Sequence, residues 1–144
     1  MKKGCPYGTH RVISPKGVLP QPADVIDNTM EIYDNEVLIE VHTLNIDSAS
    51  FTEIERRAEG DIEEIKKIIM NIVETTGKHK NPWTGSGGML IGKVKAIGPN
   101  FEGDLRVGDK IATLVSLSLT PLVIDEILDI RPEIDQVDVR GKAV

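Results

Sequence analysis

The sequence lacks three features that would point to particular classes of protein. It has one cysteine, Cys5, so no internal disulfide can form, which fits the reducing cytoplasm. No run approaches the roughly 20 apolar residues that a membrane helix needs, and no apolar stretch follows the two N-terminal lysines. The formal net charge of -6 argues against the basic face that nucleic acids require. We therefore expect a soluble, cytoplasmic protein that binds neither membranes nor nucleic acid.

The sequence does have the composition of a folded globular domain. Of its 144 residues, 40% are hydrophobic and 28% are charged, and no repeat or low-complexity tract is present. A chain of this length buries roughly 68–70% of the surface that its unfolded form exposes, so one self-sufficient core is expected. Prolines and glycines are frequent in the first thirty residues and predict an extended, irregular segment there.

Alternation of apolar and polar residues predicts a mainly β fold. The strongest strand is Glu36–His42, where Val37, Ile39 and Val41 alternate with polar residues, and apolar residues recur as far as Ile46. Turn residues separate the later strands at short intervals, which is typical of barrels, so we expect a partly open β-barrel. The other predicted strands are Met89–Ile97 with a bulge near Gly92, Lys110–Val115, Leu122–Ile127, Leu128–Ile130 and Val137–Val139.

Two helices are predicted between the first two long strands. Thr52 and Glu55 match a capping box, which predicts that the first helix starts there, and Gly60 ends it. The second is an amphipathic helix around residues 61–76, with Asp61 in the capping position. Because its isoleucines recur at helical spacing, we expect that face to pack on an apolar surface.

The glycine-rich segment Pro82–Gly92 is the stretch that most suggests chemistry. A glycine-rich loop before a helix can hold a phosphate, but this one precedes a strand. Neither a dinucleotide fingerprint nor a P-loop lysine follows it. In one interpretation the glycines serve only backbone geometry. In the other, exposed backbone N–H groups, together with Thr84 and Ser86, border a cleft where substrate meets a nicotinamide.

A family resemblance appears when separate segments are taken together. They resemble the N-terminal GroES-like domain of the zinc-type alcohol dehydrogenase, or medium-chain dehydrogenase, superfamily. The more specific part is a glycine-ended strand, a variable turn and a Val-Gly-Asp-Lys-Ile-Ala strand. The segments that carry the resemblance are Glu36–Val41, Leu44–Ser48, Met89–Gly98 and Val107–Ala112.

A narrower resemblance covers the whole chain. It is to the family of L-erythro-3,5-diaminohexanoate dehydrogenases of lysine fermentation, and it is carried by Gly4–Val12, Asn45–Phe51, Thr84–Met89 and Leu114–Leu122. The resemblance implies NAD- or NADP-dependent oxidative deamination of a small diamino acid to 5-amino-3-oxohexanoate. It also implies a longer parent enzyme with a Rossmann cofactor domain.

The sequence departs from the superfamily at its metal sites. Zinc enzymes of the superfamily usually place a cysteine after the first long strand and a Gly-His-Glu before the second. Here Ile46 or its neighbours and Gly85–Gly88 stand at those places. The single cysteine excludes the four-cysteine zinc lobe, and His10, His42 and His79 are far apart with no ligand spacing. We therefore expect no metal.

Asp47, Ser48 and Ser50 form the other candidate cluster. One interpretation is a turn whose side chains cap the helix that follows. The other follows from the resemblance, which aligns Ser48 with the proton-relay hydroxyl of the superfamily. In that case Ser48 contacts the reacting nitrogen or its water, and Asp47 balances a substrate ammonium. Asn45 and Ser50, in the same turn, are then substrate-binding residues.

Three further side chains keep two interpretations each. Glu53 and Glu55 could also face an ammonium, although on a helix of this kind they are usually solvated. Trp83, the only tryptophan, directly precedes the glycine loop and fits either a core position or a cleft wall.

Two functions from different classes follow. The first is that residues 1–144 are the catalytic domain of a dehydrogenase, since the chain ends at Gly141–Val144 within what resembles a new element. The second is a stand-alone GroES-like binding or assembly module without catalysis. The sequence does not decide between NAD and NADP, and it leaves open whether the protein is a homo-oligomer.

Overall fold

The computed structural model describes residues 1–144, which form two β-sheets and two α-helices. The larger sheet is antiparallel with the strand order β5-β4-β3-β7-β6, and the smaller sheet pairs β1 with β2. The elements are η1 (Thr9–Arg11), β1 (Val12–Ser14), β2 (Val25–Ile26), β3 (Val37–Ile46), α1 (Ser48–Arg57), α2 (Ile62–Thr76), β4 (Gly88–Ile97), β5 (Lys110–Ala112), η2 (Leu117–Leu119), β6 (Leu122–Arg131), η3 (Pro132–Ile134) and β7 (Gln136–Ala143).

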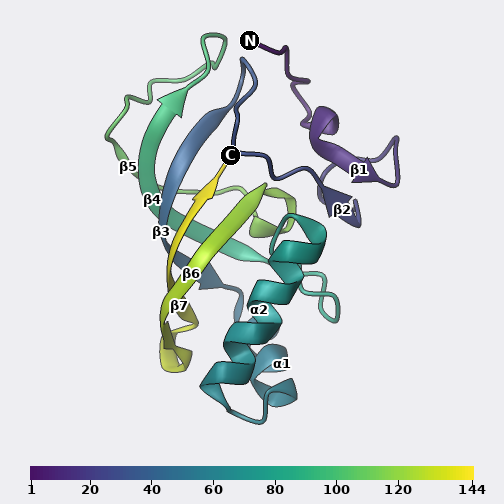
Figure 1. Cartoon of the computed structure of the whole chain (residues 1–144), viewed down its shortest axis with the longest axis vertical. Coiled ribbons are helices and arrows are strands. Elements are labelled where there is room, and N and C mark those ends of the chain that lie inside the picture. Colours follow the sequence, from purple (N-terminus) through teal and green to yellow (C-terminus); the bar gives the residue numbers. More distant parts are fainter.

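The five-stranded sheet is open, because no pairing joins its outer strands β5 and β6. It curves beside α1 and α2, as Figure 1 shows, and the N-terminal strands β1 and β2 lie near one end of α2. The predictions of a mainly β fold, a partly open sheet and an amphipathic helix near residues 61–76 are confirmed. The architecture is consistent with a GroES-like fold.

The central strand β3 changes its buried face part-way along. Val37, Ile39 and Val41 are buried, and then the pattern shifts by one residue to Leu44 and Ile46. The shift follows from an irregularity between Val41 and Thr43, where β3 has one more residue than β4, while β7 has one more residue than β3. The bulge predicted near Gly92 therefore exists at that level of the sheet, but the extra residue belongs to β3.

The first helix begins one turn earlier than predicted. Helix α1 starts at Ser48, directly after β3, and not at Thr52. The apolar residues Phe51, Ile54 and Ala58 explain the difference, because their helical spacing lets the whole segment pack on the core. Packing of this kind outweighs a local capping pair.

The second helix has the predicted ends. The Asp61 carboxylate accepts a hydrogen bond of 2.9 Å from the backbone N–H of Glu63, and Gly77 closes the helix with φ of 78°. A side chain at Gly77 would also collide with the carbonyl oxygen of Ile26, so the same residue lets β2 approach the helix end. Buried Ile65 and Ile69 face the core, as the spacing predicted.

The C-terminal strands are longer than predicted. The strands predicted over Leu122–Ile127 and Leu128–Ile130 are one strand, β6, whose register shifts twice against β7. The segment Gly141–Val144, interpreted as the start of a new element, continues β7. Strand β5 ends at Ala112 and not at Val115. The residues next along, Leu114 and Val115, are exposed.

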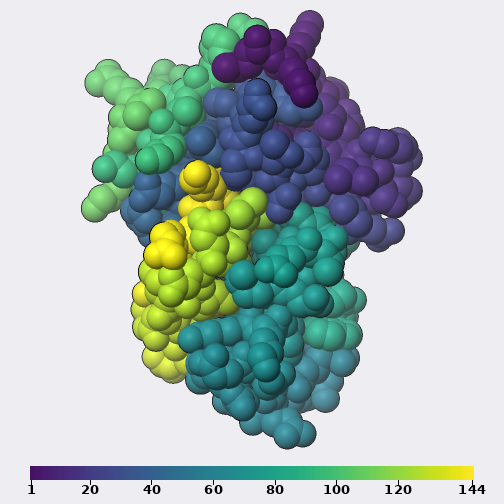
Figure 2. Space-filling view, viewed as in Figure 1, coloured from purple at the N-terminus to yellow at the C-terminus, as the bar shows by residue number.

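The core is a cluster of 21 buried residues between the large sheet and the helices. Figure 2 shows α1 and α2 covering the lower part of the molecule next to β6 and β7.

The N-terminal segment is irregular as predicted, with its own small cluster of Val12, Ala23 and Ile26. Buried Arg11 joins it to Glu36, the residue before β3, through two hydrogen bonds to the carboxylate, of 2.9 and 2.7 Å. No helix is both long enough and apolar enough to cross a membrane.

Candidate functional site

The predicted site residues meet where β3 passes into α1 and where the glycine loop passes into β4. Antiparallel pairing puts Ile46 opposite Gly88 and Asn45 opposite Met89. The backbone N–H of Asp47 donates a hydrogen bond of 3.0 Å to the carbonyl of Gly87. Two segments that are distant in the sequence therefore form one junction.

Asp47 and Ser48 are exposed candidates at this junction. Asp47 is the N-cap residue of α1, yet its side chain makes no capping hydrogen bond. Ser48 is the first residue of the helix, and both side chains are exposed with no hydrogen-bond partner in the protein. The capping interpretation therefore does not account for Asp47. A carboxylate and a hydroxyl lie side by side in the sequence, free to bind a ligand.

Ser50 and Asn45 have different surroundings. The Ser50 side chain is fully buried, and its hydroxyl accepts a hydrogen bond of 2.9 Å from the side-chain amide of Asn81. Asn45 is half-buried and lies on the face of β3 opposite Leu44 and Ile46. Its side-chain oxygen is buried without a partner. Ser50 thus belongs to the interior of the junction, whereas Asn45 flanks it.

Thr84 and Ser86 form a hydroxyl pair on the outside of the loop. Their side-chain oxygens are 2.7 Å apart, and the backbone N–H of Ser86 donates to Thr84 Oγ1 at 3.3 Å. Thr84 is exposed and Ser86 is partly exposed. Both belong to the loop whose Gly87 carbonyl accepts the hydrogen bond from Asp47, and their place at the border of a substrate site stays a prediction.

The glycines of the loop serve the packing of the protein. A Cβ at Gly87 would lie 2.5 Å from the backbone nitrogen of Ser118, and a Cβ at Gly88 would lie 2.1 Å from the carbonyl oxygen of Asn45. The chain itself occupies the space that these glycines leave. The loop therefore does not fit a dinucleotide pyrophosphate, and the backbone interpretation accounts for it.

Asn81 is a residue of the junction that sequence reasoning missed. It is fully buried, and its side chain bonds both to α1 and to the turn that carries Thr84. The sequence contains a weak signal for it, because an Asn-Pro pair, Asn81-Pro82, favours turn initiation. That signal gives no hint of a partner 31 residues away.

Trp83 lies neither in the core nor in open solvent. Its side chain is 43% exposed, and the Arg57 guanidinium stacks over its ring with Cζ 3.8 Å from the ring centroid.

The Glu53 carboxylate already has protein partners, since it accepts hydrogen bonds from Arg56 and Arg57. The hydrogen bond from Arg56 is the main cause of a lowered Glu53 pKa. The alternative in which Glu53 faces a ligand would need to displace both arginines.

Two buried bases precede the loop. His79 is completely buried, neither ring nitrogen has a partner, and burial lowers its pKa to about 4. The Lys78 ammonium donates to the carbonyls of Pro20 and Gln21 at 2.6 and 3.1 Å. Burial, with a smaller effect of nearby Lys80, lowers the Lys78 pKa to about 8. Lys78 therefore holds the start of the loop to the N-terminal segment.

No group of three or more metal-ligating side chains is present. The three histidines are in separate places with separate surroundings. His10 contacts Glu36 at 2.9 Å, His42 contacts Glu40 at 3.5 Å, and His79 is enclosed. At the places where the superfamily has zinc ligands, Ile46 and Gly88 pair with each other in the sheet and supply no donor side chain. The residues present do not fit the catalytic zinc of that superfamily.

Comparison with known proteins identifies the family. A family model described as the L-erythro-3,5-diaminohexanoate dehydrogenase N-terminal domain matches residues 10–144. The chain belongs to this family.

Two curated relatives carry the family name. L-erythro-3,5-diaminohexanoate dehydrogenase of Fusobacterium nucleatum is 66% identical over 146 residues, and the match covers 100% of this chain. The enzyme of the same name from Acetoanaerobium sticklandii is 63% identical over 144 residues, covering 99% of this chain. The chain spans 42% of the length of each relative, so it corresponds to the N-terminal domain of the L-erythro-3,5-diaminohexanoate dehydrogenase family.

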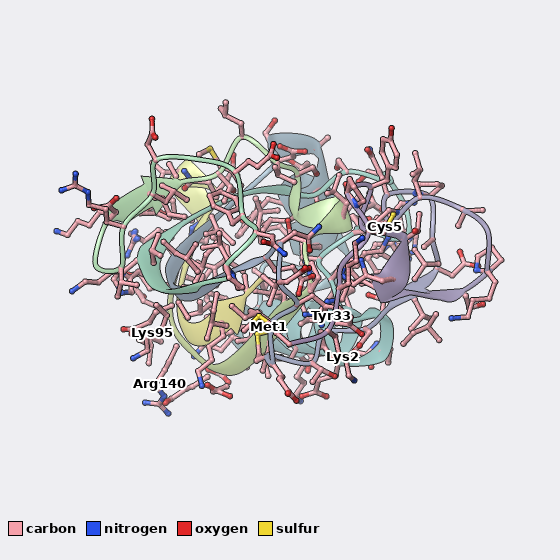
Figure 3. All side chains as sticks on the ribbon, turned by 90° about the horizontal axis from the view of Figure 1, so that it is seen from above. Met1, Lys2, Cys5, Tyr33, Lys95 and Arg140 are labelled. Carbon is pink, nitrogen blue, oxygen red and sulfur yellow. The ribbon has the colours of Figure 1, made fainter.

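The chain also has a cavity of about 560 Å³ away from the junction. The N-terminal segment, the start of β3 and the chain after β5 line it, and none of the predicted site residues does. Cys5 is one of its lining residues, and the Thr9 hydroxyl and backbone N–H groups lower the thiol pKa. Figure 3 shows Cys5 on the opposite side of the molecule from Lys95 and Arg140. Sequence reasoning gave no sign of this cavity.

Proposed function

We propose that this chain is the catalytic N-terminal part of an NAD- or NADP-dependent dehydrogenase. The complete enzyme would oxidatively deaminate L-erythro-3,5-diaminohexanoate to 5-amino-3-oxohexanoate in lysine fermentation, in the cytoplasm. Family membership and the names of the two relatives support the reaction. The single cysteine is in keeping with a reducing compartment.

The observation that carries the proposal is the exposed pair Asp47 and Ser48. The substrate has two amino groups, which are ammonium ions at neutral pH. A carboxylate without a protein partner binds such a group by a charge-assisted hydrogen bond. We assign that contact to Asp47, which would fix one end of the substrate.

Ser48 has the chemistry for the reacting end. A hydroxyl both donates and accepts hydrogen bonds, so Ser48 can accept a proton from the reacting ammonium while its own proton passes to solvent. It can relay a proton in the same way from the water that later adds to the imine carbon. The two residues are adjacent at the start of α1, and the helix fixes their spacing. Ser48 is thus the proposed proton-handling residue.

Thr84 and Ser86 complete the proposed site on the loop side. Their hydroxyls already bond to each other, so a ligand contact needs only that exposed pair to rotate. Asn45 would flank the substrate from β3, and buried Ser50 would support the junction from within.

A nicotinamide cofactor, when bound, would accept the hydride from the carbon that carries the reacting amine. We assign cofactor binding to the part of the enzyme beyond this chain, because the glycine loop here is filled by its own backbone contacts. The residues of this chain bind the substrate, orient it and handle its proton.

The proposal is tested in the full-length enzyme with D47N and S48A. Loss of the charged contact in D47N should raise KM and lower kcat/KM roughly 10- to 100-fold, because hydrogen bonds to charged groups contribute about 1.5–3 kcal/mol. S48A should lower kcat with little change in KM. D125N and T52A, exposed positions on β6 and α1, are matched controls and should retain full activity.

Two results would contradict different parts of the proposal. Unchanged kcat and KM in both D47N and S48A would remove these residues from the site while leaving the reaction intact. No turnover of 3,5-diaminohexanoate by the unsubstituted full-length enzyme, with either NAD or NADP, would exclude the substrate.

A further inference from the structure

We propose that Asn81 is a positioning residue of this site, which holds the turn carrying Thr84 and Ser86 at a fixed place relative to α1. The inference rests on the proposed function, since it assigns a purpose to geometry around Asp47 and Ser48. Asn81 touches none of the groups assigned to substrate, and it acts through Ser50 on the helix side and through backbone N–H groups on the loop side.

The contacts of the Asn81 side chain join the two segments. Its amide nitrogen donates to the carbonyl and the hydroxyl oxygen of Ser50, at 3.1 and 2.9 Å. Its oxygen accepts from the backbone N–H groups of Trp83 and Thr84, at 2.8 and 3.1 Å. One planar group therefore spans from the first turn of α1 to the loop.

The backbone of Asn81 closes the same turn. Its N–H donates to the carbonyl of Ser86 at 2.8 Å, and its carbonyl accepts from the N–H of Gly85 at 2.8 Å. The residue is fully buried. A side-chain amide has two N–H donors and two acceptor lone pairs, and all four are used here. No capacity is left for a ligand, which separates a positioning role from a binding one.

Only an amide side chain can both donate to Ser50 and accept from the loop. The Ser50 carbonyl can only accept, so its partner must be a donor, and the Trp83 and Thr84 N–H groups need an acceptor. In N81D the new carboxyl group has nearly the same shape as the amide but, when ionised, offers acceptors alone. That carboxylate would face the Ser50 carbonyl in a buried place and be driven away from it. N81D therefore keeps the turn and breaks the link to α1.

The loop has a second, independent attachment. The Gly87 carbonyl stays bonded to the N–H of Asp47, and Gly88 stays paired with Ile46. Loss of the Asn81 link should consequently displace the Trp83–Ser86 turn while leaving the start of β4 in place. Trp83, as the only tryptophan of the chain, reports that displacement directly.

The test uses N81D, the milder S50A, and N71D as a matched control on the exposed face of α2. In the 144-residue chain, acrylamide quenching of Trp83 fluorescence should rise in N81D and, less, in S50A, and not in N71D. In the full-length enzyme, measured well below the unfolding temperature, kcat should fall roughly 10- to 100-fold in N81D, because small misplacements of positioning groups cost that much.

The pH dependence of kcat in N81D distinguishes a positioning role from a purely structural one. The carboxyl group introduced by N81D can, once protonated, donate again to Ser50. The ratio of N81D to unsubstituted kcat should therefore recover as the pH falls through the pKa of that carboxyl.

Three outcomes decide the inference. Folded N81D and S50A with unchanged Trp83 quenching would overturn it. So would raised quenching in N81D with unchanged kcat and KM. An inactive unsubstituted enzyme would refute the proposed substrate, and the quenching arm would still decide whether Asn81 sets the loop position.

Discussion

The Arg57 guanidinium lies over the indole ring of Trp83, with Cζ 3.8 Å from the ring centroid. Arg57 is in the last turn of α1, and its Nε also donates to Glu53 at 2.8 Å. The helix therefore holds the loop from outside by a cation–π contact, as Asn81 holds it from inside by hydrogen bonds.

Replacing Arg57 by alanine should loosen Trp83. An exposed cation–π contact contributes about 0.5–1 kcal/mol, so R57A should lower the free energy of unfolding by that amount and raise acrylamide quenching of Trp83. The matched control is R56A, which removes two hydrogen bonds to the same Glu53 but no contact with Trp83. Equal quenching in R57A and R56A would show that the stacked geometry does not persist in solution.

Alanine at Gly88 should be far more damaging than alanine at Gly85. Both glycines have positive φ, 138° and 72°, but a Cβ at Gly88 meets the Asn45 carbonyl, whereas one at Gly85 meets nothing within 4 Å. We expect G85A to cost about 1 kcal/mol of backbone strain and G88A more than about 2 kcal/mol. Chemical denaturation of the two variants measures the difference. Similar midpoints would contradict the close approach of β3 and β4 at the junction.

The strand pattern could be predicted from the sequence only where burial alternates without interruption. The start of β3 alternates plainly, but β6 carries two register shifts that space Ile124, Ile127 and Ile130 three residues apart. Because of that spacing, the sequence predicts two short strands where the structure has one. The start of α1 was missed for a related reason, since Thr52 and Glu55 gave a local capping signal while Phe51 and Ile54 packed on the core.

The candidate site was predictable in part. Asp47, Ser48, Thr84 and Ser86 could be selected from residue type and from the family resemblance, and the structure brings their segments together. Asn81 could not be selected, because its role lies in hydrogen bonds to a residue 31 positions away that leave no periodic trace in the sequence.

Removing the Glu36 charge should destabilise the attachment of the N-terminal segment. The Arg11 guanidinium is 2% exposed, and its charge is balanced chiefly by Glu36, at 2.7 Å, with Asp27 farther away at 3.8 Å. E36Q leaves only the farther Asp27 to balance that buried charge. A wholly unpaired buried charge costs about 3–5 kcal/mol, so E36Q should lower the free energy of unfolding by up to that amount. The exposed pair Arg140 and Glu126 supplies the control, and E126Q should change the free energy of unfolding by less than about 1 kcal/mol. A loss in E36Q no larger than in E126Q would contradict the buried pairing.

His79 should make stability depend on pH in the acid range. In the folded protein its pKa is lowered to about 4 by burial, against 6.5 for the ordinary group. Between these two pKa values the unfolded chain binds a proton at His79 and the folded chain does not. The contribution of His79 to the free energy of unfolding is therefore fully present above pH 6.5 and is lost as the pH falls toward 4, at about 1.4 kcal/mol per pH unit.

The H79L variant isolates this effect from the carboxylates that titrate in the same range. Leucine is similar in volume and removes two buried nitrogens that have no partners, so H79L should be as stable as the unsubstituted chain at pH 7 or more stable. Its stability should also exceed that of the unsubstituted chain by a margin that grows as the pH falls from about 6.5 to about 4.5. A constant difference between H79L and the unsubstituted chain across this range would mean that the His79 ring reaches water or a partner in solution.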